Sequence, residues 1–365
     1  MDMWFFLRQC YNKINNGLLK PFHEKVIILA FKYFYDKKMS KLIKNKDILS
    51  REQKTAINKF YSSYCKIGYV QHAFYTEKTG IFSPYYIPDS IYFSYIDRTF
   101  NDWEYAKYTD NKCNYWRLFR GVSQPYNFVY RENGYWFNSK HELIAFDVAL
   151  DLLLSLKEDF FIKIATESYG GKGVTYINWI GLTPDFLEKT INQLNGDLVI
   201  QKVLKQSPVL SAINPSSVNT IRVLSFLRRD GFVKIYSRVL RMGIGKSKVD
   251  NASSGGITCG IKLDGKLKNI AYKANGDSFE EHPTTHIKFD NLTIPNIDKI
   301  DALVKKLHIQ IPRCRLVSWD IALSAENEPI LIEVNLCQGE LDFHQLNNGP
   351  LFGEDTQQVL EEIFK

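Results

Sequence analysis

Residues 315–335 read RLVSWDIALSAENEPILIEVN, in which two apolar stretches flank a short polar one. This pattern predicts a β-hairpin with its turn at Glu326-Asn327. Because side chains alternate between the two faces of a strand, that turn places Asp320 opposite Glu333, with Asn335 on the same face as Glu333. Two carboxylates and an amide oxygen on one face of a rigid hairpin are donors that suit Mg²⁺.

The opposite face of this hairpin is expected to be apolar. The residues expected on this apolar face are Val317, Ile321, Ile330, Ile332 and Val334, whereas Leu331 is expected on the face of Glu333. Two carboxylates this close repel each other when no cation lies between them, which predicts a raised pKa for both in the metal-free protein. The alternative is that these acids face solvent or pair with Lys or Arg side chains.

The chain before the hairpin alternates strands, turns and helices, which predicts an α+β fold with a largely antiparallel sheet. The expected strands are 160–165, 174–180, 197–204, 219–227, 231–240, 256–263 and 266–272. Helices are expected after a capping box formed by Ser139 and Glu142, after Thr183-Pro184, and at 297–308.

A glycine-rich loop follows the first of these strands. Lys163 lies in the strand FFIKIA, and the loop after it contains Gly170, Gly171 and Gly173. Glycines let backbone N–H groups approach phosphate oxygens, and a lysine binds phosphate as a point charge. The loop leads into a strand and not into a helix, so it is not a P-loop. Taken alone, it is equally consistent with an ordinary turn.

Arginines within apolar strands give a further signal. Arg222 lies in NTIRVLSFL, and Arg238 and Arg241 lie in YSRVLRMG, with Arg238 expected on the same face as Lys234. A buried arginine is costly unless it is paired or faces a ligand. The loop that begins near Asn251 offers an amide side chain beside them. The alternatives are structural ion pairs and a plain loop.

The first 75 residues are rich in Lys, Tyr and Phe and include a basic amphipathic stretch at 24–43. Such a helix either packs on the body of the protein or lies on an anionic membrane surface. A net charge of +7 spread over 365 residues is too small to indicate a nucleic-acid binder. The cysteines lack metal-ligand spacing, and the sequence shows no signal peptide, so a cytoplasmic location is expected.

Taken in order, these signals resemble the ATP-grasp superfamily, and within it the sugar-transfer-associated group found with surface-polysaccharide genes. The likeness extends over most of the chain. Besides the hairpin, it covers FSPYYIPDSIYFSYIDRTFND, FIKIATESYGGKGV, LVIQKVLKQSPVLSAINPSSVNTIRVLSF and RMGIGKSKVDNASSGGI. The resemblance implies an ATP-grasp fold in which two α+β subdomains clamp ATP, with a helical and aromatic N-terminal region.

The resemblance also implies roles for single residues. The phosphates of ATP are expected to meet two lysines and a glycine lid: Lys112, Lys163, Gly170, Gly171 and Gly173. Adenine is expected at the hinge, whose backbone belongs to Gln201, Lys202 and Val203. The hinge lacks the acidic residue with which many ATP-grasp enzymes hold the ribose.

The remaining roles concern the reacting groups. Mg²⁺ is expected on Asp320, Glu333 and Asn335. The transferred phosphate and the acyl intermediate are expected to meet Arg222, Arg238 and Asn251.

Four regions follow from this assignment. They are a basic helical region at 1–75, the first part of the ATP-grasp body at 76–138, a small lid subdomain at 139–202, and a C-terminal subdomain with the metal site at 203–365.

The implied activity is that of a carboxylate–amine ligase that uses ATP and Mg²⁺ and forms an acyl phosphate. The expected substrates are a small carboxylate and an amine, one of them part of a sugar nucleotide or glycan destined for a capsule or O-antigen lipopolysaccharide. Residues 1–75 are expected to contact a glycosyltransferase or the inner face of the membrane. The alternatives are a sugar kinase on the same fold and a non-catalytic scaffold for glycosyltransferases.

Overall fold

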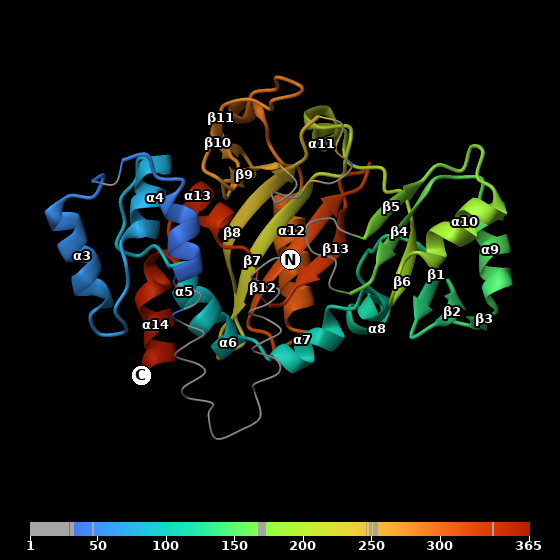
Figure 1. The fold of residues 1–365 in the computed structure, drawn as a ribbon, viewed down its shortest axis with the longest axis horizontal. Coiled ribbons are helices and arrows are strands. Elements are labelled where there is room, and N and C mark those ends of the chain that lie inside the picture. Colours follow the sequence, from blue (N-terminus) through green and yellow to red (C-terminus); the bar gives the residue numbers. More distant parts are fainter. Residues whose placement is uncertain are drawn as a thin grey trace. The chain divides into compact units, whose positions relative to one another are not determined.

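The computed structural model describes residue 29 and residues 33–45, 47–166, 173–245, 247, 250, 255–337 and 339–365 (Figure 1). The chain forms two compact units. Unit 1 combines residues 1–100 with residues 340–365, and unit 2 comprises residues 101–339. Each unit is described below by itself.

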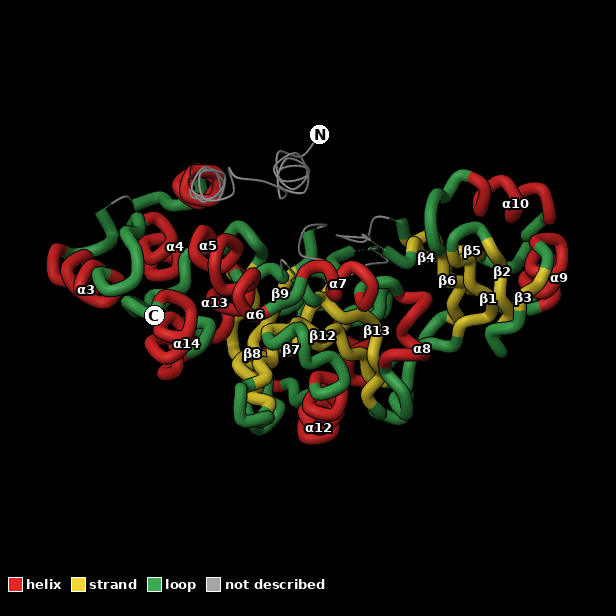
Figure 2. Tube along the Cα trace, turned by 90° about the horizontal axis from the view of Figure 1, so that it is seen from below, coloured by secondary structure: helices red, strands yellow, loops and turns green. Residues whose placement is uncertain are grey.

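Unit 2 contains a seven-stranded sheet with the order β11-β10-β9-β8-β7-β12-β13, and every neighbouring pair is antiparallel. Its strands are β7 (Thr220–Leu227), β8 (Val233–Met242), β9 (Ile257–Ile261), β10 (Leu267–Tyr272), β11 (Ser278–Phe279), β12 (Leu316–Leu323) and β13 (Pro329–Asn335). Helix α12 (Ile297–His308) covers one face, as Figure 2 shows. Its apolar side chains and those of the sheet form the main core of the unit. The antiparallel α+β prediction and the helix at 297–308 are confirmed.

The β12–β13 hairpin pairs Asp320 with Glu333, as the sequence predicts. The turn itself differs: Ser324 N–H donates to Glu328 O, and Asn327 adopts a left-handed φ of 62°. This three-residue loop shifts the pairing by one residue, and a bulge between the Asp320 and Ile321 pairs shifts it back.

The same bulge corrects the prediction for the apolar face of the hairpin. Leu331 pairs with Ile321 and lies in the main core, so it does not share the face of Glu333. The strict alternation used for the prediction fails because the bulged strand contains one extra residue.

The second sheet of unit 2 has the order β3-β2-β1-β6-β4-β5 and is also antiparallel throughout. Its strands are β1 (Asn127–Glu132), β2 (Tyr135–Asn138), β3 (Leu143–Ile144), β4 (Phe160–Ile164), β5 (Val174–Ile177) and β6 (Leu198–Lys202). Helices α9 (Phe146–Ser155) and α10 (Pro184–Asn192) pack their apolar sides with this sheet in a second core. We call residues 127–202 the lid.

The start of α10 agrees with the sequence, because the Thr183 hydroxyl accepts a hydrogen bond from Phe186 N–H and caps the helix. The predicted capping box at Ser139 and Glu142 is wrong. Glu142 instead bonds Asn138 in a turn that leads into β3, and α9 begins only after Ala145. The first two strands of the lid also precede residue 139, since the β1–β2 hairpin turns at Asn133-Gly134.

Short helices connect these elements. In unit 2 they are α7 (Trp103–Thr109), η2 (Lys112–Asn114), α8 (Tyr115–Leu118), α11 (Pro208–Ile213) and η5 (Phe289–Asn291). Residues 111–119 touch both sheets. Cys113 packs in a small cluster with Tyr130 and Val199 of the lid, whereas Phe119 packs edge-on against Trp319 of the large sheet. We call residues 111–119 the strap.

Unit 1 is helical. It contains α3 (Arg51–Tyr61), α4 (Val70–Thr79), α5 (Asp89–Ile91), the π-helix η1 (Tyr92–Ile96), α6 (Asp97–Phe100), α13 (Asp342–Asn348), η6 (Gly353–Asp355) and α14 (Thr356–Phe364). Much of the predicted amphipathic stretch at 24–43 lies outside the described residues. Within its described part, helical residues 33–40 bury Tyr35 and Met39, and the Tyr35 ring stacks on Phe93 at 5.1 Å. Over the described ranges, no helix combines the length and the apolar character needed to cross a bilayer.

Candidate active site on the polar face of the large sheet

Three charged side chains meet on the face of the large sheet that does not carry α12. Arg222 of β7 is the direct neighbour of Asp320 of β12. Its guanidinium forms a two-point contact with that carboxylate, with Nε–Oδ1 at 2.5 Å and Nη2–Oδ2 at 2.7 Å. Arg241 of β8 adds an Nη1–Oδ2 contact at 2.8 Å. All three side chains are buried, so this cluster is a charged centre inside the protein.

The electrostatics of Asp320 follow from these partners. Burial by itself raises the pKa of a carboxyl group, but the guanidiniums of Arg222 and Arg241 outweigh it and lower the pKa of Asp320 to about 2. The prediction of a raised pKa for Asp320 is therefore wrong. It considered repulsion between two carboxylates and left out the arginines on the neighbouring strands.

Glu333 forms an ion pair with a lysine of the strap. The Lys112 ammonium of the strap donates to Glu333 Oε1 at 2.7 Å, and Lys112 is 8% exposed. Burial acts to lower the pKa of Lys112, but the charge and hydrogen bond of Glu333 raise it on balance. Lys112 therefore stays charged beside the hairpin.

The strap also fixes strand β13, which is an edge of the sheet. Val334 N–H donates to the Tyr115 hydroxyl at 3.1 Å, and Leu331 N–H donates to Ser123 O at 2.9 Å. On the lid side, Lys112 N–H donates to Ala165 O at 3.0 Å. The strap thus positions Lys112 between the end of β4 and Glu333.

Two polar atoms of the hairpin have no partner among the described residues. Glu333 Oε2 accepts no hydrogen bond there, in contrast to Oε1. The Nδ2 atom of Asn335, which faces no solvent, likewise has no hydrogen-bond partner in the described part of the chain. Next to the charged centre, Glu333 Oε2 can therefore accept one more interaction and Asn335 Nδ2 can donate one more.

Lys163 of β4 belongs to the lid, and charged groups of the same site affect its pKa. Burial lowers the pKa of Lys163 to about 8, and the Lys112 charge adds to this effect, while Glu333 and Asp250 oppose it. A lysine with this environment is short of counter-charge. The residue is half-buried and paired across the sheet with Val174.

Of the three glycines predicted to cover phosphates, only Gly173 lies within the described residues. It has a φ of 80°, and a Cβ on it would meet the Ile164 side chain at 2.6 Å. Only glycine fits this turn. Gly170 and Gly171 lie outside the described residues, as does Asn251.

The predicted hinge residues lie at the end of the central lid strand β6. Gln201 is buried and pairs with Phe161 and Asn127 on its two sides. Lys202 N–H donates to Tyr126 O, and Val203 follows the strand. These contacts place the three residues where the lid chain leaves its sheet.

Arg238 is not part of the cluster. It lies on the face covered by α12, where its guanidinium binds Asp301 of that helix, with Nε–Oδ1 at 2.6 Å. The bulge between the Leu224 and Ser225 pairs also moves Lys234 to the other face. The sequence-based grouping of Arg238 with the reacting groups and with Lys234 therefore does not match the geometry.

Two residues that carry no assigned role in the prediction belong to the cluster. Arg241 binds Asp320, as described above. Asp250 accepts a hydrogen bond from Thr220 N–H at 3.0 Å and from the Thr220 hydroxyl, and lies 3.8 Å from Arg241. Counting residues from Arg222 through the β7–β8 pairing would have placed Arg241 on the polar face, but only if the bulge were known.

Residues 94–361 match the family model described as sugar-transfer associated ATP-grasp. The chain belongs to this family. ATP-grasp enzymes use ATP and Mg²⁺ as cofactors. None of the curated proteins matches the sequence.

Several solved structures are similar to this ATP-grasp chain. D-cycloserine synthetase is 12% identical over 73% of this chain and 74% of its own, with a TM-score of 0.45. The L-amino acid ligase from Bacillus licheniformis is 13% identical over 70% of this chain, with a TM-score of 0.40. This chain spans 48% of that ligase and 45% of a carboxyaminoimidazole ribonucleotide synthetase solved as an ADP complex.

The donor atoms of the hairpin suit the Mg²⁺ of the ATP-grasp family. The available donors are the free Glu333 Oε2, the Asn335 amide and the lone pairs of Asp320 that the arginines leave over. Carboxylate and amide oxygens are hard ligands, and Mg²⁺ needs only a few of them besides water and phosphate oxygens. Within the described ranges, no three His, Cys, Asp or Glu side chains group together as a metal site, so the amide is needed to complete the set.

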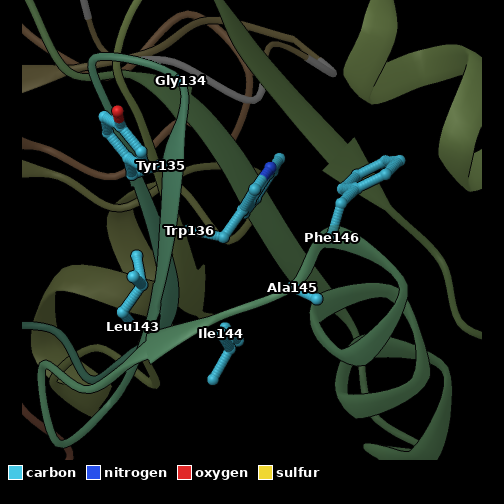
Figure 3. A pocket seen from close by; sticks show the side chains of 7 residues that line it. All are labelled: Gly134, Tyr135, Trp136, Leu143, Ile144, Ala145 and Phe146. Carbon is cyan, nitrogen blue, oxygen red and sulfur yellow. The ribbon is translucent and has the colours of Figure 1, made fainter.

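A separate hollow lies at the outer edge of the lid. Figure 3 shows its lining, Gly134–Trp136 and Leu143–Phe146, around a volume of about 510 Å³. Tyr135 and Leu143 are exposed there. None of the predicted site residues lines this hollow, so it is not the candidate active site.

Proposed function

We propose that this ATP-grasp enzyme is a carboxylate–amine ligase that activates its carboxylate substrate as an acyl phosphate. The observation that carries the proposal is the convergence of four cations, Lys112, Lys163, Arg222 and Arg241, around Asp320 and the partly unpaired hairpin donors. This arrangement combines charge for phosphoryl oxygens with oxygen ligands for Mg²⁺.

The proposed roles follow the geometry. Lys163 and Lys112 bind the phosphates of ATP from the lid and the strap. Gly170, Gly171 and Gly173 keep the phosphate-covering role that the resemblance implies. The backbone at 201–203 reads adenine. Asp320, Glu333 and Asn335 would hold Mg²⁺, which would supply positive charge for the phosphate oxygens.

Arg222 and Arg241 act on the reacting groups, and Asn251, which lies outside the described residues, keeps the role that the resemblance implies for it. Because Asp320 already neutralises part of their charge, the two arginines are fixed before substrate binds. Fixed cations stabilise the developing charge of the transition state without reorganising. In this proposal Arg241 takes the role that the sequence assigned to Arg238.

The reaction has two steps. A carboxylate oxygen of the substrate attacks the γ-phosphorus of ATP, which forms an acyl phosphate and releases ADP. The nitrogen of an amine then attacks the acyl carbon, phosphate leaves, and the nitrogen loses a proton to give the amide. The protein contributes positioning and charge and no covalent nucleophile.

The biological setting is part of the proposal and rests on the sugar-transfer association of the family. One substrate belongs to a sugar nucleotide or glycan of a cell-surface polysaccharide. The enzyme works in the cytoplasm, and residues 1–75 bring it to a glycosyltransferase or to the inner face of the membrane.

Nucleotide binding is the first test. Titration calorimetry with ATP and Mg²⁺ should show saturable binding that disappears when the metal is chelated. Lys163→Ala should weaken it about tenfold, the effect of losing one charge-assisted contact of about 1.4 kcal/mol. Lys189→Ala, which removes an exposed lysine from α10 of the same lid, is the matched control and should bind as the wild type does. Absence of nucleotide binding at any metal concentration would refute the site.

Product analysis separates the ligase from a kinase. The enzyme is incubated with ATP, a panel of acidic sugars and a panel of amines, and the products are measured by mass spectrometry. A ligase gives free phosphate and an amide whose mass is the sum of both substrates less water. A stable phosphosugar would instead establish the kinase.

A further inference from the structure

The interior of unit 1 contains several polar side chains, and some of their atoms have no hydrogen-bond partner among the described residues. Helix α4 buries six successive residues, three of which are Gln71, His72 and Thr76. Each of these has a side-chain polar atom that is shielded from solvent and lacks a hydrogen-bond partner in the described part of the chain. Folded proteins leave few buried polar atoms unpaired, and such atoms commonly mark the place of a ligand or water.

Two of the unpaired atoms belong to residues that a hydrogen bond joins. The Gln71 amide oxygen accepts a hydrogen bond from Asp89 N–H at 2.8 Å, which anchors the amide beside the start of α5. The Gln71 Nε2 donor and the Asp89 Oδ2 acceptor both remain without a described partner. Gln71 is 2% exposed and Asp89 is 3% exposed. The pair therefore presents one free donor and one free acceptor within the same small region.

A second buried carboxylate faces this region. Asp342, at the start of α13, interacts electrostatically with Asp89, and the charges of both reach the Tyr75 hydroxyl. The loop before Asp89 is held in place by Gln345 of α13, whose amide donates to Ile87 O and accepts from Ile87 N–H. Asp89 and Asp342 thus lie on elements that are fixed to each other.

The local charge is negative. Asp36 and Glu340 add to the charge of the two buried acids, and Lys38 opposes them. Lys38 is exposed at the surface of unit 1, so it compensates the acids only from outside. The buried acids respond accordingly: burial and mutual repulsion raise the pKa of Asp89 to about 8, and burial raises the pKa of Asp342 to about 6.

We propose that unit 1 carries a binding site for a small primary amine with a neighbouring oxygen, such as an amino alcohol or an amino sugar, formed by Gln71, Asp89 and Asp342. The ammonium group donates to Asp89 Oδ2, where it takes the place of the proton that Asp89 holds at neutral pH. The oxygen of the ligand accepts the free Gln71 Nε2–H. One ligand of this class satisfies both unpaired atoms and the excess of negative charge.

The site goes beyond the ligase function and does not depend on it, because it can be tested without ATP. The probe is ethanolamine, titrated by calorimetry into the full-length protein at pH 7. Ethylene glycol, which lacks the charge, and KCl, which lacks the directed hydrogen bonds, are the comparison ligands. Saturable binding of ethanolamine alone is expected.

The variants are chosen to distinguish a ligand site from a structural cluster. Asp89→Asn keeps the shape and should weaken ethanolamine binding at least about tenfold, which corresponds to about 1.4 kcal/mol. Lys38→Met should strengthen binding several-fold, because the acids lose their competing cation. Lys37→Met and Asp47→Asn alter exposed charges of the same unit and should leave the affinity unchanged.

A proton readout completes the test. Asp89 with a pKa near 8 is largely protonated at pH 7, so binding an ammonium group should release a proton, and the measured heat should vary with the ionisation enthalpy of the buffer. No saturable binding, equal binding of K⁺ or ethylene glycol, or equal affinity of Asp89→Asn would each overturn the proposal. Loss of ATP binding in the separate nucleotide titration would leave this result unaffected.

Discussion

Two of the buried aspartates in the described part of the chain have opposite electrostatics. Asp320 in the large sheet of unit 2 and Asp89 in unit 1 have the same 3% exposure. Two guanidiniums lower the pKa of Asp320 to about 2, whereas a second carboxylate and burial raise the pKa of Asp89 to about 8. Burial acts to raise the pKa of both groups; it prevails at Asp89, where Asp342 adds to it, and is outweighed at Asp320 by the two guanidiniums that the fold supplies.

The difference suggests two uses of a buried acid. In unit 2 Asp320, Arg222 and Arg241 form a centre with a net positive charge, whose side chains are already paired before substrate arrives. Among the described residues of unit 1, no guanidinium is bonded to Asp89, and in our proposal a ligand or a proton supplies the positive charge there. The following experiments test this contrast.

Asp320→Asn should give the largest effect on stability. It leaves Arg222 and Arg241 buried without their carboxylate, and breaking a buried ion pair costs about 3–5 kcal/mol. Urea unfolding of the variant should show this loss, whereas Asp264→Asn, in an exposed turn, should unfold like the wild type. A variant as stable as the wild type would mean that the three charges are solvated and do not form a buried centre.

Glu333→Gln should give the next effect, on catalysis. Loss of a metal ligand should remove about 3–4 kcal/mol of transition-state stabilisation, which is about 10²–10³-fold in turnover. Because Lys112 then loses its carboxylate partner, the unfolding midpoint should fall as well, whereas simple repulsion between Asp320 and Glu333 would make it rise.

The matched control for this variant is Glu328→Gln, near the turn of the same hairpin, where Glu328 pairs with Lys299 in an exposed position. Its ATP turnover should be unchanged. Near-full turnover of Glu333→Gln would show that the hairpin does not form the metal site.

Asp89→Asn should change the pH dependence of stability. A carboxyl group whose pKa is raised from 3.8 to about 8 on folding makes the protein lose stability as the pH rises from about 4 to about 8. Asp89 contributes a slope of about 1.4 kcal/mol per pH unit in that window, which the Asn variant should lack.

The contribution of Asp320 to the pH dependence of stability has the opposite sign, so Asp320 serves as the internal comparison. Its lowered pKa adds stability that is lost only as the pH falls from about 4 to about 2. Unfolding measured between pH 2 and pH 9 covers both windows. An unchanged slope above pH 4 in Asp89→Asn would show that Asp89 is ionised at neutral pH like an ordinary surface acid.

Arg238→Ala should give the smallest effect. The ion pair with Asp301 lies on the α12 face, so its loss should cost about 1 kcal/mol of stability and leave the ATP turnover within about twofold of the wild type. Parallel measurements of urea unfolding and ATP hydrolysis check both parts. A large drop in turnover at unchanged stability would show that Arg238 does act on the reacting groups.

The pattern of residues along the chain determined much of this structure. The antiparallel α+β class, the strands from Phe160 onward and helix α12 follow from local apolar periodicity and turn residues, which act over a few residues. The facing of Asp320 and Glu333 was also predicted, although through a turn that is one residue too short and a bulge that compensates for it. Local sequence patterns are sufficient to predict which residues face each other wherever a single strand and a single turn determine the pairing.

Tertiary structure decided what local patterns do not encode. One bulge moved Leu331 to the core face of its strand, and the other separated Arg238 from Lys234, so that Arg238 lies on the face of α12 and meets Asp301 there. The charge states of Asp320 and Asp89 depend on partners far away in sequence, Arg222 for one and Asp342 for the other. An alternation rule carries no information on such partners, because bulges and long-range ion pairs are settled only when whole elements pack together.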